Sequence, residues 1–178
     1  MKRNIATILT VIVLCAACTK DDKALTIANQ EAAIDSYIAS TLKDYPLVRN
    51  NGSNRVIVEE ALNPSAKVLE YGDSLYFYYA GYVFTSSPST LFATNVEEVA
   101  IQSGFEITDP DFSVMKIPFE KGSIIVGLEN GLAGTKEGEH CVILFSAQYG
   151  FYSDAVYNIP RLSALAFEIW IDKVIKNQ

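Results

Sequence analysis

The hydrophobic and polar positions of this chain change their pattern twice along the sequence. Residues 5–14 form a largely apolar run that contains Thr7 and Thr10, and residues 26–42 then carry apolar side chains at helical spacing. From residue 55 onward, short stretches of alternating or continuous apolar residues are separated by clusters of Gly, Asn, Asp and Pro, as in strands joined by turns. The pattern therefore predicts a helix followed by a domain rich in strands.

The stretch 26–42 predicts an amphipathic helix that ends before Pro46. Its apolar positions are Ile27, Ile34, Ile38 and Leu42. Because an apolar stripe needs a surface to cover it, we expect this helix to dock on the rest of the chain, with docking on another protein as the alternative.

Strands are predicted at residues 55–60, 66–70, 73–84, 115–119, 141–145 and 164–174. The stretch 73–84 carries aromatic side chains on both faces, so we expect a central strand that is packed on both sides. Residues 92–112 follow neither period, and no element is predicted there.

A glycine-spaced segment at residues 123–132 predicts one short helix. Gly127 and Gly131 each cost about 1 kcal/mol relative to Ala in a helix, so this helix would depend on packing under a sheet. Leu128 and Leu132 lie one turn apart and supply an apolar face for that packing.

Composition excludes several classes of function. The chain has 178 residues, 49% apolar, which suits one globular domain. Its formal net charge of −7 argues against nucleic acid as a partner.

The single His140 has no His or Cys at ligand spacing, so no metal site is expected. Cys141 shares one face of a predicted strand with Ile143 and Phe145, so it is expected to be a buried thiol.

The N-terminus has the features of a bacterial targeting segment. Lys2 and Arg3 precede the apolar run, which is too short to span a bilayer. The sequence Ala-Ala-Cys that ends at Cys18 resembles a lipoprotein signal, cleaved before a lipidated Cys, and Lys-Asp-Asp at residues 20–22 resembles a tag for surface export. We therefore expect an outer-membrane lipoprotein of a Gram-negative bacterium, periplasmic or surface-exposed. The alternative is an ordinary secretory signal.

Several short motifs occur in a fixed order over about residues 71–174. They are Tyr71-Gly72-Asp73, Tyr79-Ala80-Gly81, the segment 124–132, Lys136-Glu137-Gly138-Glu139, Tyr149-Gly150-Phe151, Ile159-Pro160 and Leu165-Ala166-Phe167. Together they resemble an FKBP-type peptidyl-prolyl cis-trans isomerase domain. The resemblance implies an α+β fold, in which an antiparallel sheet of five or six strands wraps around one short helix, here with an extra N-terminal helix. The expected division is a signal peptide at 1–17, a linker at 18–25, the helix and a turn at 26–54, and the FKBP-like domain at 55–178.

The resemblance also implies a site and an activity. The catalytic positions would be Tyr79, Ile125 (through its backbone N–H), Phe151 and Phe167, and the substrate-binding positions Phe92, Met115, Ile124, Leu128 and Ile159. The expected partner is a proline-containing peptide or an unfolded protein in the cell envelope, bound without a cofactor or a metal.

Four positions depart from the family pattern. Leu128 stands where many members have Trp, Phe151 where Tyr is usual, Ala93 where Asp usually follows Phe92, and Met115 where an aromatic wall is usual. The alternative function is a binding module for a peptide, a glycan or a protein that kept this fold without catalysis. Exposure of its aromatic residues Tyr149, Tyr152, Tyr157 and Trp170 would favour it. An envelope-complex subunit that docks through the N-terminal helix is a third possibility.

Overall fold

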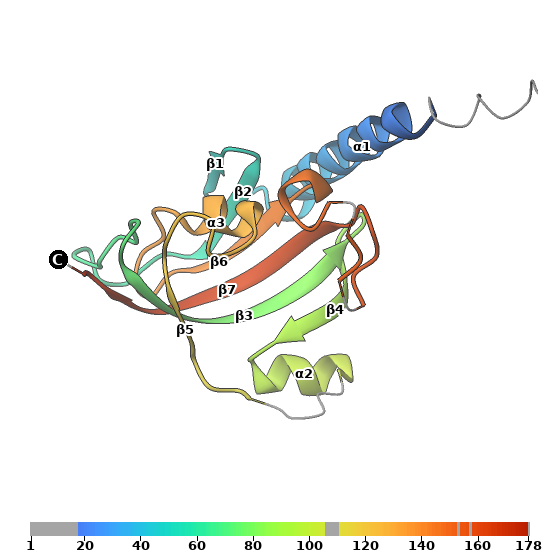
Figure 1. Cartoon of the computed structure of the whole chain (residues 1–178). Coiled ribbons are helices and arrows are strands. Elements are labelled where there is room, and N and C mark those ends of the chain that lie inside the picture. The colour runs from blue at the N-terminus through green and yellow to red at the C-terminus, as the bar shows by residue number, and fades with distance from the viewer. Residues whose placement is uncertain (1–17, 106–110, 153, 157, 178) are drawn as a thin grey trace, which may run out of the picture.

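The computed structural model describes residues 18–105, 111–152, 154–156 and 158–177. These residues form one seven-stranded antiparallel sheet with helices packed against it (Figure 1). The strands are β1 (Leu47–Asn50), β2 (Ser53–Glu59), β3 (Ser74–Phe84), β4 (Pro88–Thr94), β5 (Met115–Pro118), β6 (His140–Phe145) and β7 (Ala164–Ile175). The helices are α1 (Cys18–Thr41), α2 (Glu97–Ser103) and α3 (Val126–Leu132), with a 3-10 turn at Ala147–Tyr149.

The strand order is β1-β2-β6-β7-β3-β4, and β5 also pairs with β3. Strands β3 and β7 pair along their whole length, from Ser74 opposite Ile175 to Phe84 opposite Ala164. This long central pair sets which side chains face each side of the sheet, because successive residues of a strand point to opposite faces.

Both faces of β3 are covered, which confirms the prediction of a strand packed on both sides. On one face, here called the α3 face, the buried Leu75 and Phe77 join a core cluster with Leu128 and Leu132 of α3. On the other, the α1 face, Phe84 packs in a second cluster against α1. Helix α1 contributes Ile34 and Ile38 to that cluster, and Leu42, the residue just after the helix, joins them. The helix thus docks on its own domain, as expected.

The fold class is confirmed, whereas several expected boundaries are wrong. Helix α1 begins at Cys18, so residues 18–25 are helical and not a linker. The expected turn lies at Asn51–Gly52, where it joins β1 and β2 into a hairpin, and the strand β1 before it was not expected. Residues 66–70 form no strand beyond one bridge between Val68 and Lys136.

The sheet also has more than the expected five or six strands. Strands β1 and β4 lie at the two ends of the strand order, where many side chains are exposed. An exposed edge strand does not need strict alternation, so its sequence pattern is weak. The expected signal peptide at 1–17 lies outside the described residues. Within the described part of the chain, we find no helix with the length and apolar character needed to cross a bilayer.

Helix α3 lies unusually close to the sheet, and this explains its glycines. A Cβ atom at Gly127 would lie 2.3 Å from the ring of Phe145, and one at Gly131 would lie 2.2 Å from Ile143. Glycine removes these clashes and lets the helix backbone rest directly on β6. The helical cost of the two glycines is therefore offset by close packing against the sheet.

Buried polar side chains hold α3 at both ends. Arg55 of β2 donates to the carbonyl oxygens of Gly131, Ala133 and Gly134 at 3.3, 3.1 and 3.3 Å, which satisfies the last carbonyls of the helix. Near the first turn, the buried Glu129 accepts hydrogen bonds from the Tyr71 hydroxyl (2.9 Å) and the Gly122 N–H (2.6 Å). These contacts fix the helix that forms one wall of the candidate site.

Candidate functional site between α3 and the sheet

The centre of the candidate site is the crossing of β3 and β7 on the α3 face. Gly81 lies opposite Phe167, and Tyr79 lies opposite Ile169, so Tyr79 and Phe167 are diagonal neighbours on one face. A Cβ at Gly81 would come within 2.7 Å of the Phe92 ring and 3.0 Å of the Phe167 ring. Glycine at this position lets both rings lie over the strand backbone.

The rings above Gly81 form an ordered aromatic group. Phe92 of β4 meets Phe167 edge to face, with ring centroids 5.6 Å apart at 81°. Phe145 of β6 stacks on the other side of Phe167 at 5.9 Å and 15°. Edge-to-face and stacked pairs of this kind each add about 0.5–1.5 kcal/mol beyond the area that they bury, so the wall of the site is preformed.

The structure brings most of the sequence-predicted site residues to this place. Leu128, Ile159 and Phe167 are buried in the α3-face cluster. Around them, partly buried and packed against the same cluster, are Tyr79, Phe92, Ile124, Ile125 and Phe151.

Met115 is the exception among the predicted residues. It begins the short strand β5 opposite Phe77, is 38% exposed, and is not among the residues packed against the α3-face cluster. Its neighbour Ile117, two residues on and on the same face, does pack there. The part assigned to Met115 in substrate binding stays a prediction.

Ile125 stands directly before α3 in an extended conformation, with φ −59° and ψ 139°. Its carbonyl accepts the first helical hydrogen bond, from the Glu129 N–H at 3.0 Å. Its own N–H finds no acceptor among the described residues. The first N–H groups of a helix have no partner within the helix, so this one can bind a ligand carbonyl beside the aromatic wall.

The chemistry available in the site is apolar contact and hydrogen bonding. Burial raises the pKa of the half-buried Tyr79, so its hydroxyl stays protonated at neutral pH and can donate a hydrogen bond. No group of three or more His, Cys, Asp or Glu among the described residues is placed to hold a metal ion. Cys141 is fully buried in the core, and burial raises the pKa of its thiol, which makes it unreactive.

Asn95 supports the site and was missed by sequence reasoning. Its buried amide accepts the Tyr79 N–H at 2.7 Å and donates to the carbonyls of Phe77 (3.3 Å) and Ser113 (2.9 Å). It thereby fixes the β3 backbone beside Tyr79. Asn95 lies in the stretch that follows neither helical nor strand periodicity, and a lone Asn there gives no signal of this role.

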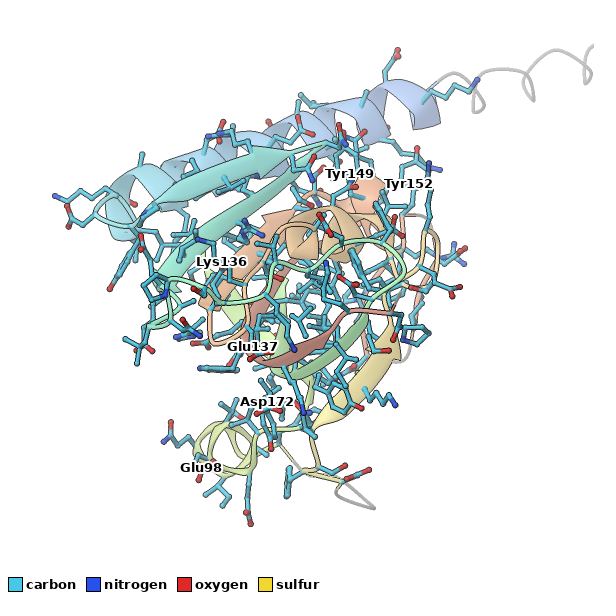
Figure 2. The ribbon with its side chains drawn as sticks, turned by 90° about the vertical axis from the view of Figure 1, so that its left-hand side faces the viewer. Glu98, Lys136, Glu137, Tyr149, Tyr152 and Asp172 are labelled. Carbon is cyan, nitrogen blue, oxygen red and sulfur yellow. The ribbon has the colours of Figure 1, made fainter. Side chains whose placement is uncertain are left out.

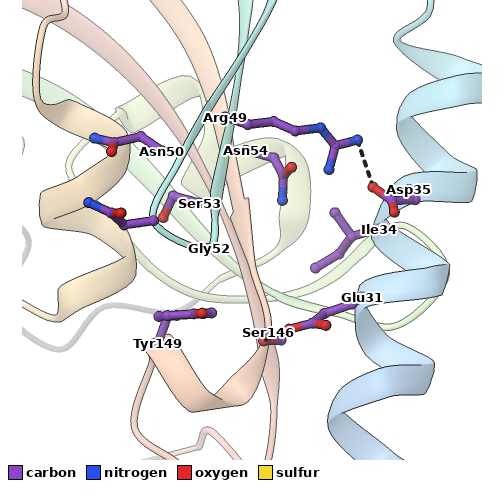
Figure 3. A pocket seen from close by; sticks show the side chains of 11 residues that line it. Glu31, Ile34, Asp35, Arg49, Asn50, Gly52, Ser53, Asn54, Ser146 and Tyr149 are labelled. Carbon is purple, nitrogen blue, oxygen red and sulfur yellow. Dashed lines mark hydrogen bonds and ion pairs between the residues drawn. The ribbon is translucent and has the colours of Figure 1, made fainter.

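Away from this site, a cavity of about 360 Å³ lies between α1 and the β1–β2 hairpin (Figure 3). Its charged groups are already paired within the chain. Arg49 of β1 lies 2.8 Å from Asp35 of α1, and Glu31 accepts hydrogen bonds from Ser146 (3.2 Å) and Gln148 (2.8 Å). These contacts show that the cavity is part of the polar interface between α1 and the rest of the domain.

Of the aromatic residues expected to mark a binding surface, Tyr152 is 41% exposed, while Tyr149 and Trp170 are half-buried. Tyr157 lies outside the described residues. Tyr149 is held against the hairpin, where its ring covers Gly52 so closely that no Cβ would fit. Its aromatic face therefore serves the fold at this point.

Comparison with known proteins agrees with this geometry. The sequence of residues 67–172 matches the family described as FKBP-type peptidyl-prolyl cis-trans isomerase. The chain belongs to this FKBP family. The matched segment begins shortly before β3 and ends within β7. It contains α3 and the three stacked or edge-to-face rings Phe92, Phe145 and Phe167. No curated protein matches the sequence closely enough to extend this assignment.

Solved structures show the same fold at low sequence identity. FkpA from Escherichia coli superposes with a TM-score of 0.60 and 17% identity, over 87% of this chain and 63% of FkpA. The structure of the three FKBP domains of wheat FKBP73 gives a TM-score of 0.57 and 13% identity, over 75% of this chain and 50% of that one. This FKBP-family chain thus spans about half to two thirds of the length of these relatives.

Proposed function

We propose that this chain accelerates the cis-trans isomerisation of X-Pro peptide bonds at the site between α3 and the sheet. The observation that carries the proposal is the meeting of Phe92 and Phe167 over Gly81, with Tyr79 packed against the same cluster, in a chain of the FKBP family. The ring of a bound proline would lie against the aromatic wall, with Leu128 beneath it.

The reaction suits a site with no acid, base or nucleophile. Rotation about a peptide bond is opposed by a barrier of about 18–20 kcal/mol, because resonance flattens the amide. For X-Pro bonds the uncatalysed exchange takes on the order of tens to hundreds of seconds. The planar amide is more charge-separated than the twisted one, so an apolar surface destabilises the ground state relative to the twisted transition state. Catalysis then consists of binding the twisted amide more tightly.

Two polar groups would orient the substrate in this apolar site. The N–H of Ile125 would donate to a substrate carbonyl, and the protonated hydroxyl of Tyr79 would donate to a second polar group. Phe151, which packs against the same cluster, contributes shape alone because it has no hydroxyl. Each neutral hydrogen bond is worth about 0.5–1.5 kcal/mol, so positioning here depends mainly on the fit of the proline ring.

A protease-coupled assay with a peptide that contains Leu-Pro-Phe tests the activity. We expect the chain to accelerate the slow cis-to-trans phase, and Tyr79→Leu and Phe167→Leu to lower kcat/KM by 10-fold or more. Tyr76→Leu is the matched control, because Tyr76 lies on the same strand as Tyr79 but faces the other side of the sheet. Urea unfolding confirms that each variant is folded. A wild-type rate equal to that of buffer would refute the isomerase and favour the peptide-binding alternative.

We further propose that the chain acts in the cell envelope of a Gram-negative bacterium, as an outer-membrane lipoprotein anchored through Cys18. Support comes from the basic start, the short apolar run and the Ala-Ala-Cys sequence at residues 16–18. Growth of an expressing bacterium with an alkyne fatty acid, followed by mass spectrometry of the N-terminal peptide, tests this. We expect lipid on Cys18 in the wild type and none in Cys18→Ser; an unlipidated N-terminus in the wild type would exclude the anchor.

A further inference from the structure

Another cavity, of about 460 Å³, opens on the α1 face of the sheet beside α2, and the proposed isomerase site makes no use of it. Its apolar lining includes Tyr78 of β3, Trp170 of β7 and Phe112. Its carboxylates are Glu97 and Glu98, in the first turn of α2. Figure 2 shows Glu98 on α2, at the opposite end of the molecule from Tyr149 and Tyr152 beside α1.

The two strand aromatics of this cavity are fixed in place. Tyr78 and Trp170 are direct partners in the β3–β7 register, so their rings are neighbours on the α1 face. The indole of Trp170 stacks on His140 with ring centroids 4.8 Å apart at 15°, and His140 Nε2 lies 2.9 Å from Glu168 Oε1. This chain of contacts orients the indole before any ligand arrives, which lowers the cost of binding.

The charged lining of the cavity is negative. Glu97 and Glu98 are both exposed, and neither has an ion-pair partner among the described residues. Asn95 also lines the cavity, but its amide is engaged by the β3 backbone and Ser113, so it has little left to offer a ligand. Carboxylates next to aromatic rings provide charge and quadrupole attraction for a cation.

The next aromatic on the same face already makes such a contact within the chain. Tyr76 lies two residues before Tyr78 and therefore faces the same way, and Lys116 Nζ lies 5.3 Å from the centroid of its ring. Lys116 comes from β5, which pairs beside β3 at this point. The row of rings on this face thus accommodates a lysine side chain at one position, and the cavity presents the adjacent position.

We propose that this cavity binds a lysine or arginine side chain of a polypeptide. The alkyl stem would lie against Trp170 and Tyr78, and the cationic end would face Glu97 and Glu98. Long basic side chains cover apolar surface with their stems while keeping the charge in contact with water or carboxylates. The net charge of −7 favours the approach of a basic polypeptide. This site is independent of the proposed isomerase activity, because Tyr78 and Trp170 face away from Tyr79 and Phe167.

Trp170 is the single tryptophan of the sequence, so emission excited selectively from tryptophan, and not from the ten tyrosines, reports on the surroundings of Trp170. We expect acetyl-Gly-Lys-Gly-amide and its Arg counterpart to change the Trp170 emission saturably, with affinity that falls as NaCl is raised. The Nε-acetylated lysine peptide, which has the stem without the charge, should bind at least 10-fold more weakly. Equal binding of the acetylated peptide, or a stronger response to methyl glucoside, would overturn the proposal.

Two variants test the assignment of residues. Glu97→Gln with Glu98→Gln should weaken binding of the lysine peptide by about 5-fold or more, because each exposed charge near a cation contributes up to about 1 kcal/mol. The matched control is Asp21→Asn with Asp22→Asn, a pair of exposed carboxylates near the start of α1, which should bind like the wild type. Tyr78→Leu keeps both carboxylates and the Trp170 reporter, and should also weaken binding. Unchanged affinity in both cavity variants would exclude this site, whatever the outcome of the isomerase assay.

Discussion

Replacing Arg55 by Met tests how the structure holds α3. The Arg55 side chain is 8% exposed and lies 3.4 Å, Nε to Oε1, from the carboxylate of Glu139, which is 3% exposed. The same guanidinium bonds to carbonyl oxygens at the end of α3. Methionine fills a similar volume without charge or donors, so the change isolates the polar contacts from the packing.

The expected loss of stability is large. Removing one partner of a buried ion pair costs about 3–5 kcal/mol, because the other charge is left in a low dielectric. Against a total unfolding free energy of about 5–15 kcal/mol for a domain, Arg55→Met should remove about a fifth or more. We expect a correspondingly lower urea midpoint, with an unchanged m-value because the surface exposed on unfolding is nearly the same.

The pH dependence of the stability loss shows whether the unpaired charge on Glu139 causes it. Burial raises the pKa of Glu139, and the nearby Arg55 guanidinium only partly opposes this. A carboxyl with a raised folded-state pKa loses stabilising free energy as the pH rises from its unfolded to its folded pKa. Without Arg55 the folded pKa of Glu139 rises further, so the deficit of Arg55→Met should be larger at pH 7.5 than at pH 4.5, where a larger fraction of Glu139 carries a proton.

Urea titrations at both pH values, with Glu139→Gln and the double variant, complete the test. Glutamine carries no charge, so Arg55→Met should cost at least about 2 kcal/mol less in the Glu139→Gln background, the size expected for coupled neighbours. A deficit that is the same at both pH values and in both backgrounds would refute the reasoning. Arg55 would then stabilise the fold through its bonds to α3 alone.

Two further predictions concern the close approach of α3 and the far end of the sheet. Gly127→Ala would place a Cβ 2.3 Å from the Phe145 ring, so we expect a loss of about 1–3 kcal/mol in urea unfolding, and wild-type stability would contradict the observed packing. Burial alone would raise the pKa of the Asp73 carboxyl. The hydrogen bond that Lys176 Nζ donates to it at 2.8 Å, together with backbone hydrogen bonds to the same carboxylate, outweighs this effect and holds the pKa below its usual value. The resulting stability is present above the unfolded pKa and lost as the pH falls through the folded one. Lys176→Met should therefore flatten the acid limb of a stability–pH profile, and an unchanged limb would exclude the pair as its source.

The sequence predicts the parts of this fold whose side chains are buried. In β7 the buried Leu165, Phe167 and Ile169 share one face and Glu168 lies on the other, and such a pattern is visible without a structure. In β3 the aromatic residues on both faces predict the same burial in another way. Strands β1 and β4 are not predicted from alternation, because edge strands bury fewer side chains. The start of α1 is not predicted either, because residues 20–25 are largely exposed and carry no apolar stripe.

The candidate site likewise contains residues that the sequence predicts and residues that it does not. Tyr79 and Phe167 lie in the ordered motifs at residues 79–81 and 165–167, whereas Phe92 lies in the stretch without periodicity. Asn95 acts through its amide on the backbone and has no motif. The polar ties at the ends of α3 are likewise invisible in a hydrophobicity pattern, since Arg55 reads as an ordinary exposed strand residue until the helix is placed beside it. Long-range hydrogen bonds depend on the assembled sheet.

Asn95 also bears on whether the two proposed binding surfaces communicate. It lines the cavity beside α2, and the same amide bonds to the backbone at Phe77 and Tyr79 on the central strand. A ligand that moved α2 enough to displace Asn95 would break hydrogen bonds worth about 0.5–1.5 kcal/mol each, so a weak contact with one lysine side chain cannot supply that energy. The opposite faces of β3 therefore act independently for single side chains, and coupling between them requires a ligand that binds the α2 cavity with several kcal/mol to spare.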